Sequence, residues 1–260
     1  MSVALENGRR QYDYWLTVYK RTWKGTLISS FLLPTLYLAA MGIGLGSFVD
    51  SNGTDALGGV SYLQFIAPGL LASTALQIAV GESTYPVLSG LKWQKFYYSM
   101  IATPLRPADV VYGQLAFIAF RVASTCIVFL GIIALFGGLH SPLGVLALPV
   151  VVLVGMAAAA PVVAFASTLE NDSGLAMVFR FGVIPAFLFS GAFFPVSQLP
   201  DWIEWLAYLS PLWHGVQLSR DLSLGTLHPW LVLLNLAYPL AWFLIGTRLA
   251  VRGFTRKLIG

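Results

Sequence analysis

Apolar residues gather into long runs along the chain, and polar residues fill the short gaps between them. A transmembrane helix needs about 20 mostly apolar residues in a row to cross the hydrocarbon core of a bilayer. Runs of that length predict transmembrane helices at residues 26–48, 62–84, 109–136, 144–169, 175–194 and 229–251. The pattern therefore predicts an all-α integral membrane protein with six transmembrane helices, folded as a single domain over residues 1–260.

The first amphipathic stretch, residues 1–25, is too charged to cross the membrane. Its aromatic residues Tyr12, Trp15 and Tyr19 are three or four positions apart, which places them on one face of a helix. Basic residues occupy the positions between them. The pattern predicts a helix that lies in the membrane interface.

The second amphipathic stretch, residues 90–107, combines basic and aromatic residues and ends in two prolines. Its front half predicts a short interfacial helix with a basic side and an aromatic side. Pro104 and Pro107 then end the helix, because proline lacks an amide donor and disfavours helix in the residue before it. We expect a sharp turn back into the next span. On this pattern the helix is either a membrane anchor or a contact for another protein.

Residues 197–227 are too broken for an ordinary span and too apolar for a solvated loop. Pro200 and Pro211 divide them into two short pieces, and Trp202, Trp205 and Trp213 are typical anchors at a membrane interface. Backbone that is not helical survives at membrane depth only where protein or water satisfies its polar groups. The stretch predicts a re-entrant helical hairpin that dips into the outer leaflet.

Composition and charge agree with a membrane protein. Hydrophobic residues make up 57% of the chain and charged residues only 10%, whereas a soluble domain has about 25% charged residues. The net charge of +4 comes from separate basic clusters beside the apolar runs, so it indicates membrane topology rather than a nucleic-acid partner. Residues 49–61 and 137–142 contain no Lys or Arg, which predicts that they lie outside and that both termini are cytoplasmic.

The sequence lacks the motifs of an enzyme site. It contains no Gly-Lys pair, and therefore no phosphate-binding loop of the kind that hydrolyses ATP. The GIGLG run at residues 42–46 lies inside an apolar run, so it predicts close helix packing instead of a nucleotide loop. We interpret His140, His214 and His228 as interfacial residues of the outer face, and we predict no metal site.

Ionisable residues inside the predicted spans are the remaining candidates for a site. Glu82, Arg121 and Arg180 are costly to bury in a membrane, and such residues usually face a cavity or a charged partner. Glu82 and Arg180 are expected at similar depth near the inner face, where they could form a pair, and Arg121 is expected deeper. Two interpretations stay open: a polar gate or lining of a substrate path, and a structural ion pair.

Three stretches resemble one family of membrane proteins, the ABC-2 type transporter permeases. The sequence FLLPTLY at residues 31–37, with the glycine run at 42–46, resembles the first span of the branch that exports nodulation lipo-oligosaccharides and drugs. The sequence ATPL at residues 102–105 resembles the cytoplasmic coupling turn of the family. Residues 193–216 resemble the outer hairpin of that branch. Their order along the chain matches the family layout, and the resemblance covers nearly the whole chain.

The resemblance implies a fold and two groups of functional residues. The fold is that of an ABC-2, or type V, exporter with an N-terminal interfacial helix, a cytoplasmic coupling helix and an outer re-entrant hairpin. The implied ATPase-coupling residues are Lys92, Trp93, Lys95, Phe96, Tyr97, Thr103, Pro104, Leu105 and Arg106. The implied hairpin residues are Phe194, Pro195, Pro200, Trp202, Pro211, Trp213 and His214. The coupling helix of the family often carries an acidic residue before the turn, and residues 92–102 have none.

The resemblance also implies an activity. A permease of this kind moves a lipid-like, glycolipid or hydrophobic drug substrate outward across the cytoplasmic membrane of a prokaryote. Two separate ATPase subunits would bind ATP and magnesium, and a second permease copy or a paralogue would complete the complex among membrane lipids. The alternative is a polytopic membrane enzyme or a channel-like protein without an ATPase. An enzyme would be expected to cluster acids or histidines at one interface, and the sequence has no such cluster.

Overall fold

A computed structural model of the chain describes residues 12, 15–17, 19–21, 32, 35–54, 57 and 59–260. The described residues form helices and turns, and none of them lies in a strand. The all-α membrane fold predicted from the apolar runs is therefore confirmed. Most of the predicted N-terminal helix at residues 1–25 lies outside the described residues, and so do residues 26–31 and 33–34 of the predicted first span.

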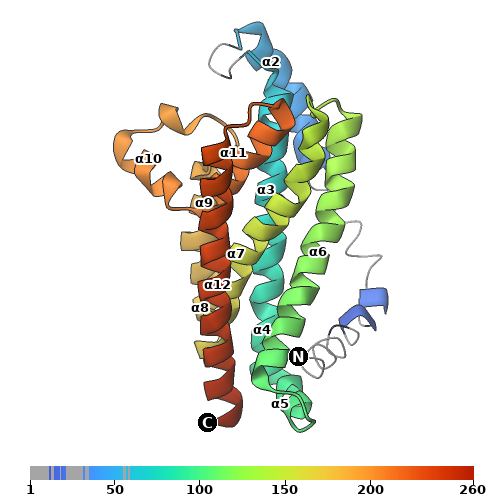
Figure 1. The fold of residues 1–260 in the computed structure, drawn as a ribbon, viewed down its shortest axis with the longest axis vertical. Coiled ribbons are helices and arrows are strands. Elements are labelled where there is room, and N and C mark those ends of the chain that lie inside the picture. The colour runs from blue at the N-terminus through green and yellow to red at the C-terminus, as the bar shows by residue number, and fades with distance from the viewer. Residues whose placement is uncertain are drawn as a thin grey trace.

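In the part of the chain that the structure describes, four helices are long and apolar enough to cross a membrane (Figure 1). The first extends from Tyr62 to Trp93 with a bend at Thr84, and it consists of α3 (Tyr62–Ser83), α4 (Tyr85–Leu88) and the π-helical segment η3 (Ser89–Trp93). The others are α6 (Pro107–Leu135), the 3-10 turn η4 (Pro142–Leu146) with α7 (Ala147–Thr168), and α12 (Pro229–Ile259).

The remaining elements are shorter. Before α3 come the π-helical segment η1 (Ala39–Leu45) and α2 (Gly46–Ser51), and α5 (Phe96–Ile101) precedes α6. After α7 comes an apolar helix made of α8 (Ser173–Met177), η5 (Val178–Val183) and α9 (Ile184–Phe189). The elements between it and α12 are η6 (Val196–Gln198), α10 (Asp201–Tyr208) and α11 (Pro211–Leu224). The apolar helix at Ser173–Phe189 is shorter than a typical span. The count of six spans stays a prediction.

Helix α7 lies at the centre of the bundle and packs against α3, α6, α11 and α12. Its small residues allow this, since a Cβ at Gly155 would lie 3.2 Å from the carbonyl oxygen of Ala75 in α3. Pro149 and Pro161 do not interrupt α7, which is one continuous helix. Pro149 lies in the first turn, where no amide donor is needed. The ring of Pro161 fills the space above Gly246 of α12, where a Cβ would lie 2.5 Å from it.

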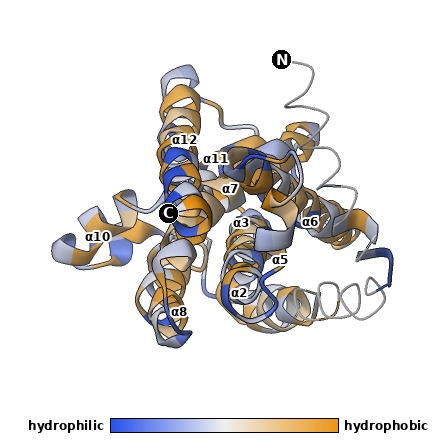
Figure 2. Cartoon of the chain, turned by 90° about the horizontal axis from the view of Figure 1, so that it is seen from below, coloured by the Kyte–Doolittle hydropathy of each residue, from blue (hydrophilic) through white to orange (hydrophobic). Residues whose placement is uncertain are grey.

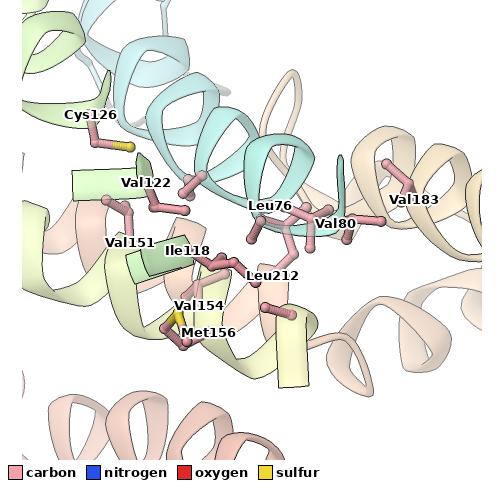
Figure 3. Packing of buried hydrophobic residues seen from close by; sticks show 14 of the residues in the cluster. Leu76, Val80, Ile118, Val122, Cys126, Val151, Val154, Met156, Val183 and Leu212 are labelled. Carbon is pink, nitrogen blue, oxygen red and sulfur yellow. The ribbon is translucent and has the colours of Figure 1, made fainter. Parts of the chain in front are cut away.

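The apolar core joins four helices at mid-height. Figure 3 shows side chains of α3, α6 and α7 converging, together with one from the start of α11. These side chains are Leu76, Val80, Ile118, Val122, Val151, Val154 and Leu212. Because Leu212 belongs to this core, α11 begins deep inside the bundle and not at its surface.

The glycine run at residues 42–46 packs against the start of α3. A Cβ at Gly42 would lie 2.4 Å from Leu63, and one at Gly46 would lie 3.8 Å from the ring of Tyr62. Close helix packing is therefore the role that the structure gives this run. Seen from below, α8 and α10 project away from the group formed by α3, α6 and α7 (Figure 2).

Candidate functional site

The stretch between α3 and α6 differs from the single amphipathic helix that the sequence predicted. The helix that begins at Tyr62 runs on to Trp93, and Lys95 then adopts a left-handed backbone with φ of +54°. Helix α5 follows and folds back on the preceding turn. Gly90 makes this reversal possible, because a Cβ there would lie 2.4 Å from the ring of Tyr97.

Tyr97 anchors α5 to two other helices. Its side chain is fully buried, and its hydroxyl donates a hydrogen bond to Oε1 of Gln114 in α6 at 3.1 Å. Its ring meets that of Phe254 in α12 at 5.3 Å. Phe96 is partly buried against Trp15, at 5.5 Å between ring centroids. The aromatic face that the sequence offered to lipid or to a partner thus packs on the protein's own helices.

The exposed part of this region is its tip. Trp93 is 58% exposed, and Lys95, Thr103, Pro104 and Arg106 are exposed as well, whereas Leu105 is half-buried. The tip is held firmly, because the Thr103 hydroxyl donates to the Met100 carbonyl at 2.6 Å. The Asp109 carboxylate accepts from the Arg106 amide at 3.0 Å, at the start of α6. A force applied at the tip would therefore reach α6 directly.

Glu170, in the turn between α7 and α8, links three segments at the same end of the molecule. Its carboxylate accepts hydrogen bonds from the amines of Lys92 in η3 and Lys257 in α12. The bonds from Lys257 and then Lys92 lower the pKa of Glu170 to about 2, and the bond to Glu170 raises the pKa of Lys257. The sequence analysis did not single out Glu170 and so missed this link.

Two of the ionisable residues predicted inside the spans, Glu82 and Arg121, form an ion pair. Arg121 of α6 donates from Nε to Oε1 of Glu82 in α3 at 3.0 Å. The ring of Tyr19 lies 4.8 Å from the Arg121 guanidinium carbon. The predicted pairing of Glu82 with Arg180 is wrong. Arg180 is exposed on η5. Arg121 is the residue that pairs with Glu82, because α3 and α6 pack against each other.

The predicted hairpin consists of α10 and α11, and prolines precede or open both helices. Pro200 comes just before α10, and Pro211 opens α11, where the Ser210 hydroxyl accepts from the Leu212 amide. Trp202 is 66% exposed, while Phe194, Pro195 and Trp213 are partly buried. The ring of Trp213 packs edge-on against Tyr208 at 4.6 Å, which fixes the angle between the two helices.

His214 lies inside the protein and not at the interface that the sequence predicted. Its ring is buried, with Nδ1 2.8 Å from Oδ1 of Asn235 in α12 and Nε2 3.1 Å from the Tyr208 carbonyl oxygen. The side chain joins α11, α12 and the end of α10. Among the described residues, no three His, Cys, Asp or Glu side chains gather as metal ligands.

Comparison with known proteins decides the family. The family model of the ABC-2 type transporter matches residues 13–224, which is most of the chain. The chain belongs to the ABC-2 type transporter family. Nodulation protein J of Rhizobium leguminosarum bv. viciae is 31% identical over 256 residues, which cover 93% of this chain and 95% of that protein. Nodulation protein J of Rhizobium meliloti (strain 1021) is 30% identical over 227 residues, or 82% of each chain.

A more distant relative has a name that states a transport role. The inner membrane transport permease YadH of Escherichia coli (strain K12) is 25% identical over 244 residues, which cover 87% of this chain and 90% of YadH. All three relatives match over most of their own length. The similarity therefore extends over most of the chain and is not confined to one motif.

Sequence reasoning missed the buried charge of Arg220 in this ABC-2 family member. Arg220 of α11 donates from Nε to the Phe65 carbonyl at 3.2 Å and from Nη2 to the Gly191 carbonyl at 2.6 Å. Its guanidinium lies 3.8 Å from the centroid of the Phe65 ring. Arg220 thus ties the hairpin to α3 and to the turn after α9. A lone arginine in an apolar segment was the available signal, since such residues rarely lack a partner.

Proposed function

We propose that this chain is the membrane-spanning permease subunit of an ATP-binding cassette exporter. Separate ATPase subunits, two per complex, bind ATP and magnesium and supply the energy. A second copy of the permease or a paralogue completes the translocation unit. The sequence has no Gly-Lys pair and hence no phosphate-binding loop, which supports placing ATP hydrolysis on a partner.

The proposal rests chiefly on the exposed, rigid tip, which consists of Trp93 and Lys95 before α5 and residues 103–106 between α5 and α6. A motor outside the chain has to act on a surface that is accessible and firmly joined to the spans. The tip meets both conditions: Trp93 and Arg106 are exposed, and Tyr97 fixes α5 to α6 and α12 through Gln114 and Phe254. A push on the tip would then move α6 and α12 together.

The distribution of charge supports an orientation in the membrane. The basic residues near the ends of the spans are concentrated at the end of the molecule that carries α5 and the C-terminus, and such residues face the cytoplasm. The permease would therefore lie in the cytoplasmic membrane with both termini inside. The substrate class follows from the likeness to the nodulation branch: a lipid-like molecule, a glycolipid or a hydrophobic drug, moved outward.

Reconstitution with the partner ATPase tests the proposal. The permease and the ATPase are placed together in proteoliposomes, and ATP hydrolysis and lipid-linked substrate export are measured. Trp93→Ala with Arg106→Ala should weaken ATPase binding and reduce export, because both side chains are exposed at the tip. Trp230→Ala is a matched control, since Trp230 is a 72% exposed tryptophan at the opposite end of α12. Failure of the wild-type permease to bind or stimulate an ATPase would refute the proposal.

A further inference from the structure

The C-terminal end of α12 extends past the membrane. The helix has 31 residues, which is about 46 Å at 1.5 Å per residue, against about 30 Å for a hydrocarbon core. Along its outward side the exposed residues change in character. Ile245 and Leu249 are apolar, Arg252 and Arg256 follow, and Ile259 is again apolar and 68% exposed. Arg252, Arg256 and Ile259 are three or four positions apart, so they form one stripe on the helix surface.

The opposite side of the same turns is fixed to the bundle. Phe254 is fully buried beneath Tyr97 of α5, and the carbonyl of Lys257 accepts a hydrogen bond from the Tyr98 hydroxyl at 3.2 Å. Gly253 lies so close to α7 that a Cβ would be 2.2 Å from the Ser167 hydroxyl oxygen. The end of α12 is therefore not a loose basic tail. It is a rigid surface joined directly to α5.

The charges on the stripe differ from those of the neighbouring lysines. Lys92 and Lys257 are both paired with Glu170. In the part of the chain that the structure describes, Arg252 and Arg256 form no salt bridge. Figure 2 shows hydrophilic residues at this end of α12, beside the C-terminus. The stripe thus presents two unpaired guanidinium groups on a rigid support, a pattern suited to the carboxylates of a protein partner.

The order of residues along the stripe favours a protein over lipid headgroups. A helix that leaves a bilayer shows apolar residues first and basic residues at the interface. Ile259 lies two turns beyond Arg252, about 10 Å further along the axis. Neither lipid headgroups nor water would bury the apolar side chain of Ile259, which lies beyond the two arginines. An acidic protein surface that also carries apolar residues would bury this side chain and pair with the arginines.

We propose that Arg252, Arg256 and Ile259 form a second docking element for the ATPase subunit, beside the α5 tip, and that they bind an acidic surface of that subunit. The inference rests on the proposed function and adds α12 to the contact. The ATPase would contact α12 and α5 at the same time. The contacts of Tyr97 with Phe254 and of Tyr98 with Lys257 would hold the two helices in a fixed relative position.

Site-specific photo-crosslinking tests the contact. A photoreactive amino acid is placed at position 256, 259 or 249 of the full-length permease, in complex with its ATPase. Positions 256 and 259 should crosslink to the ATPase. Position 249 is the control, because Leu249 is exposed on the same face but within the apolar run. Position 93 reports on the α5 tip separately.

Crosslinking from 93 but not from 256 or 259 would overturn this inference and leave the proposed function standing. No crosslink from any position, with no ATPase bound to the wild type, would overturn both.

Charge reversal provides a second test. Arg252→Glu with Arg256→Glu should lower the affinity for the ATPase about tenfold or more, whereas Arg252→Lys with Arg256→Lys should keep most of it. The measurement uses permease in nanodiscs of neutral lipid and in nanodiscs with phosphatidylglycerol. If the reversed variant binds the ATPase normally and only its response to phosphatidylglycerol is lost, the stripe binds anionic lipid and the inference is wrong.

Discussion

Glu82 and Arg121 form an ion pair between α3 and α6, with 3.0 Å between Oε1 and Nε. The Arg121 side chain is only 8% exposed and the Glu82 side chain 24%. The pair is therefore largely shielded from water, and Tyr19 covers the guanidinium from the N-terminal segment. Removing one partner would leave the other charge without compensation, which is far costlier than losing an exposed salt bridge.

The first prediction concerns this pair. Glu82→Gln and Arg121→Gln should each lower stability by about 1–3 kcal/mol, and the double variant should lose less than the sum of the two. Thermal unfolding in detergent measures the effect. Arg180→Gln is the control, because Arg180 is exposed and does not contact Glu82. Strictly additive losses, or equal damage from Arg180→Gln, would show that the pair is unimportant in solution.

The second prediction separates packing from partner binding in the α5 region. Tyr97→Ala should destabilise the fold by about 3–5 kcal/mol, since it removes a fully buried ring. Tyr97→Phe should cost about 1–3 kcal/mol, because it leaves Gln114 without its donor. Trp93→Ala should leave stability unchanged and reduce ATPase binding. Unfolding in detergent and co-purification measure the two properties. A stable Tyr97→Ala variant that loses only ATPase binding would mean that Tyr97 faces the partner.

The sequence predicted the class of fold well and the partners of individual side chains poorly. Apolar runs and prolines are local signals, and they indicate the all-α membrane fold and the turn at Pro104 before α6. The direction in which an aromatic face points is not a local property. The pattern around Tyr97 fits lipid, a partner or the protein's own helices equally, and only the fold-back at Gly90 decides among them.

The polar residues illustrate the same limit. Counting residues from the ends of the spans placed Glu82 and Arg180 at similar depth, but depth does not show which helices face each other. The sequence pattern places His214 at the outer face and so predicts an interfacial residue. The segment around His214 instead turns inward at Ser210, so that Leu212 reaches the core and His214 meets Asn235. Tertiary packing, absent from a single sequence, determines each of these contacts.

The third prediction concerns Arg220, which holds the hairpin in place. Arg220→Lys keeps the charge but offers no planar fork to reach the carbonyls of Phe65 and Gly191 together. We expect Arg220→Lys and Arg220→Met each to lower the unfolding temperature, and to raise the proteolysis rate between α9 and α10. Arg248→Lys is the control, since Arg248 is exposed on α12. An unaltered proteolysis rate in both Arg220 variants would mean that the hairpin is held by its apolar contacts alone.

The last prediction uses the pKa of Glu170, which the two lysines lower to about 2 from its usual value of about 4.5. A carboxylate whose folded pKa is depressed stabilises the folded state fully above its unfolded pKa, and this contribution disappears as the pH falls through the folded pKa. The link between Glu170, Lys92 and Lys257 should therefore stay intact from pH 8 to about pH 5. It should weaken only between about pH 4.5 and pH 2, and added salt should weaken it because the carboxylate is exposed.

Carbon-13 NMR of the Glu170 side-chain carboxyl, assigned by its loss in Glu170→Gln, measures that titration directly. Lys257→Met should raise the midpoint more than Lys92→Met, since the bond from Lys257 is the largest cause of the shift. Lys95→Met is the matched control, because Lys95 is exposed in the same region and does not bond Glu170. A wild-type midpoint near 4.5 would show that the carboxylate is not held by the lysines, and that the turn after α7 moves independently of α12.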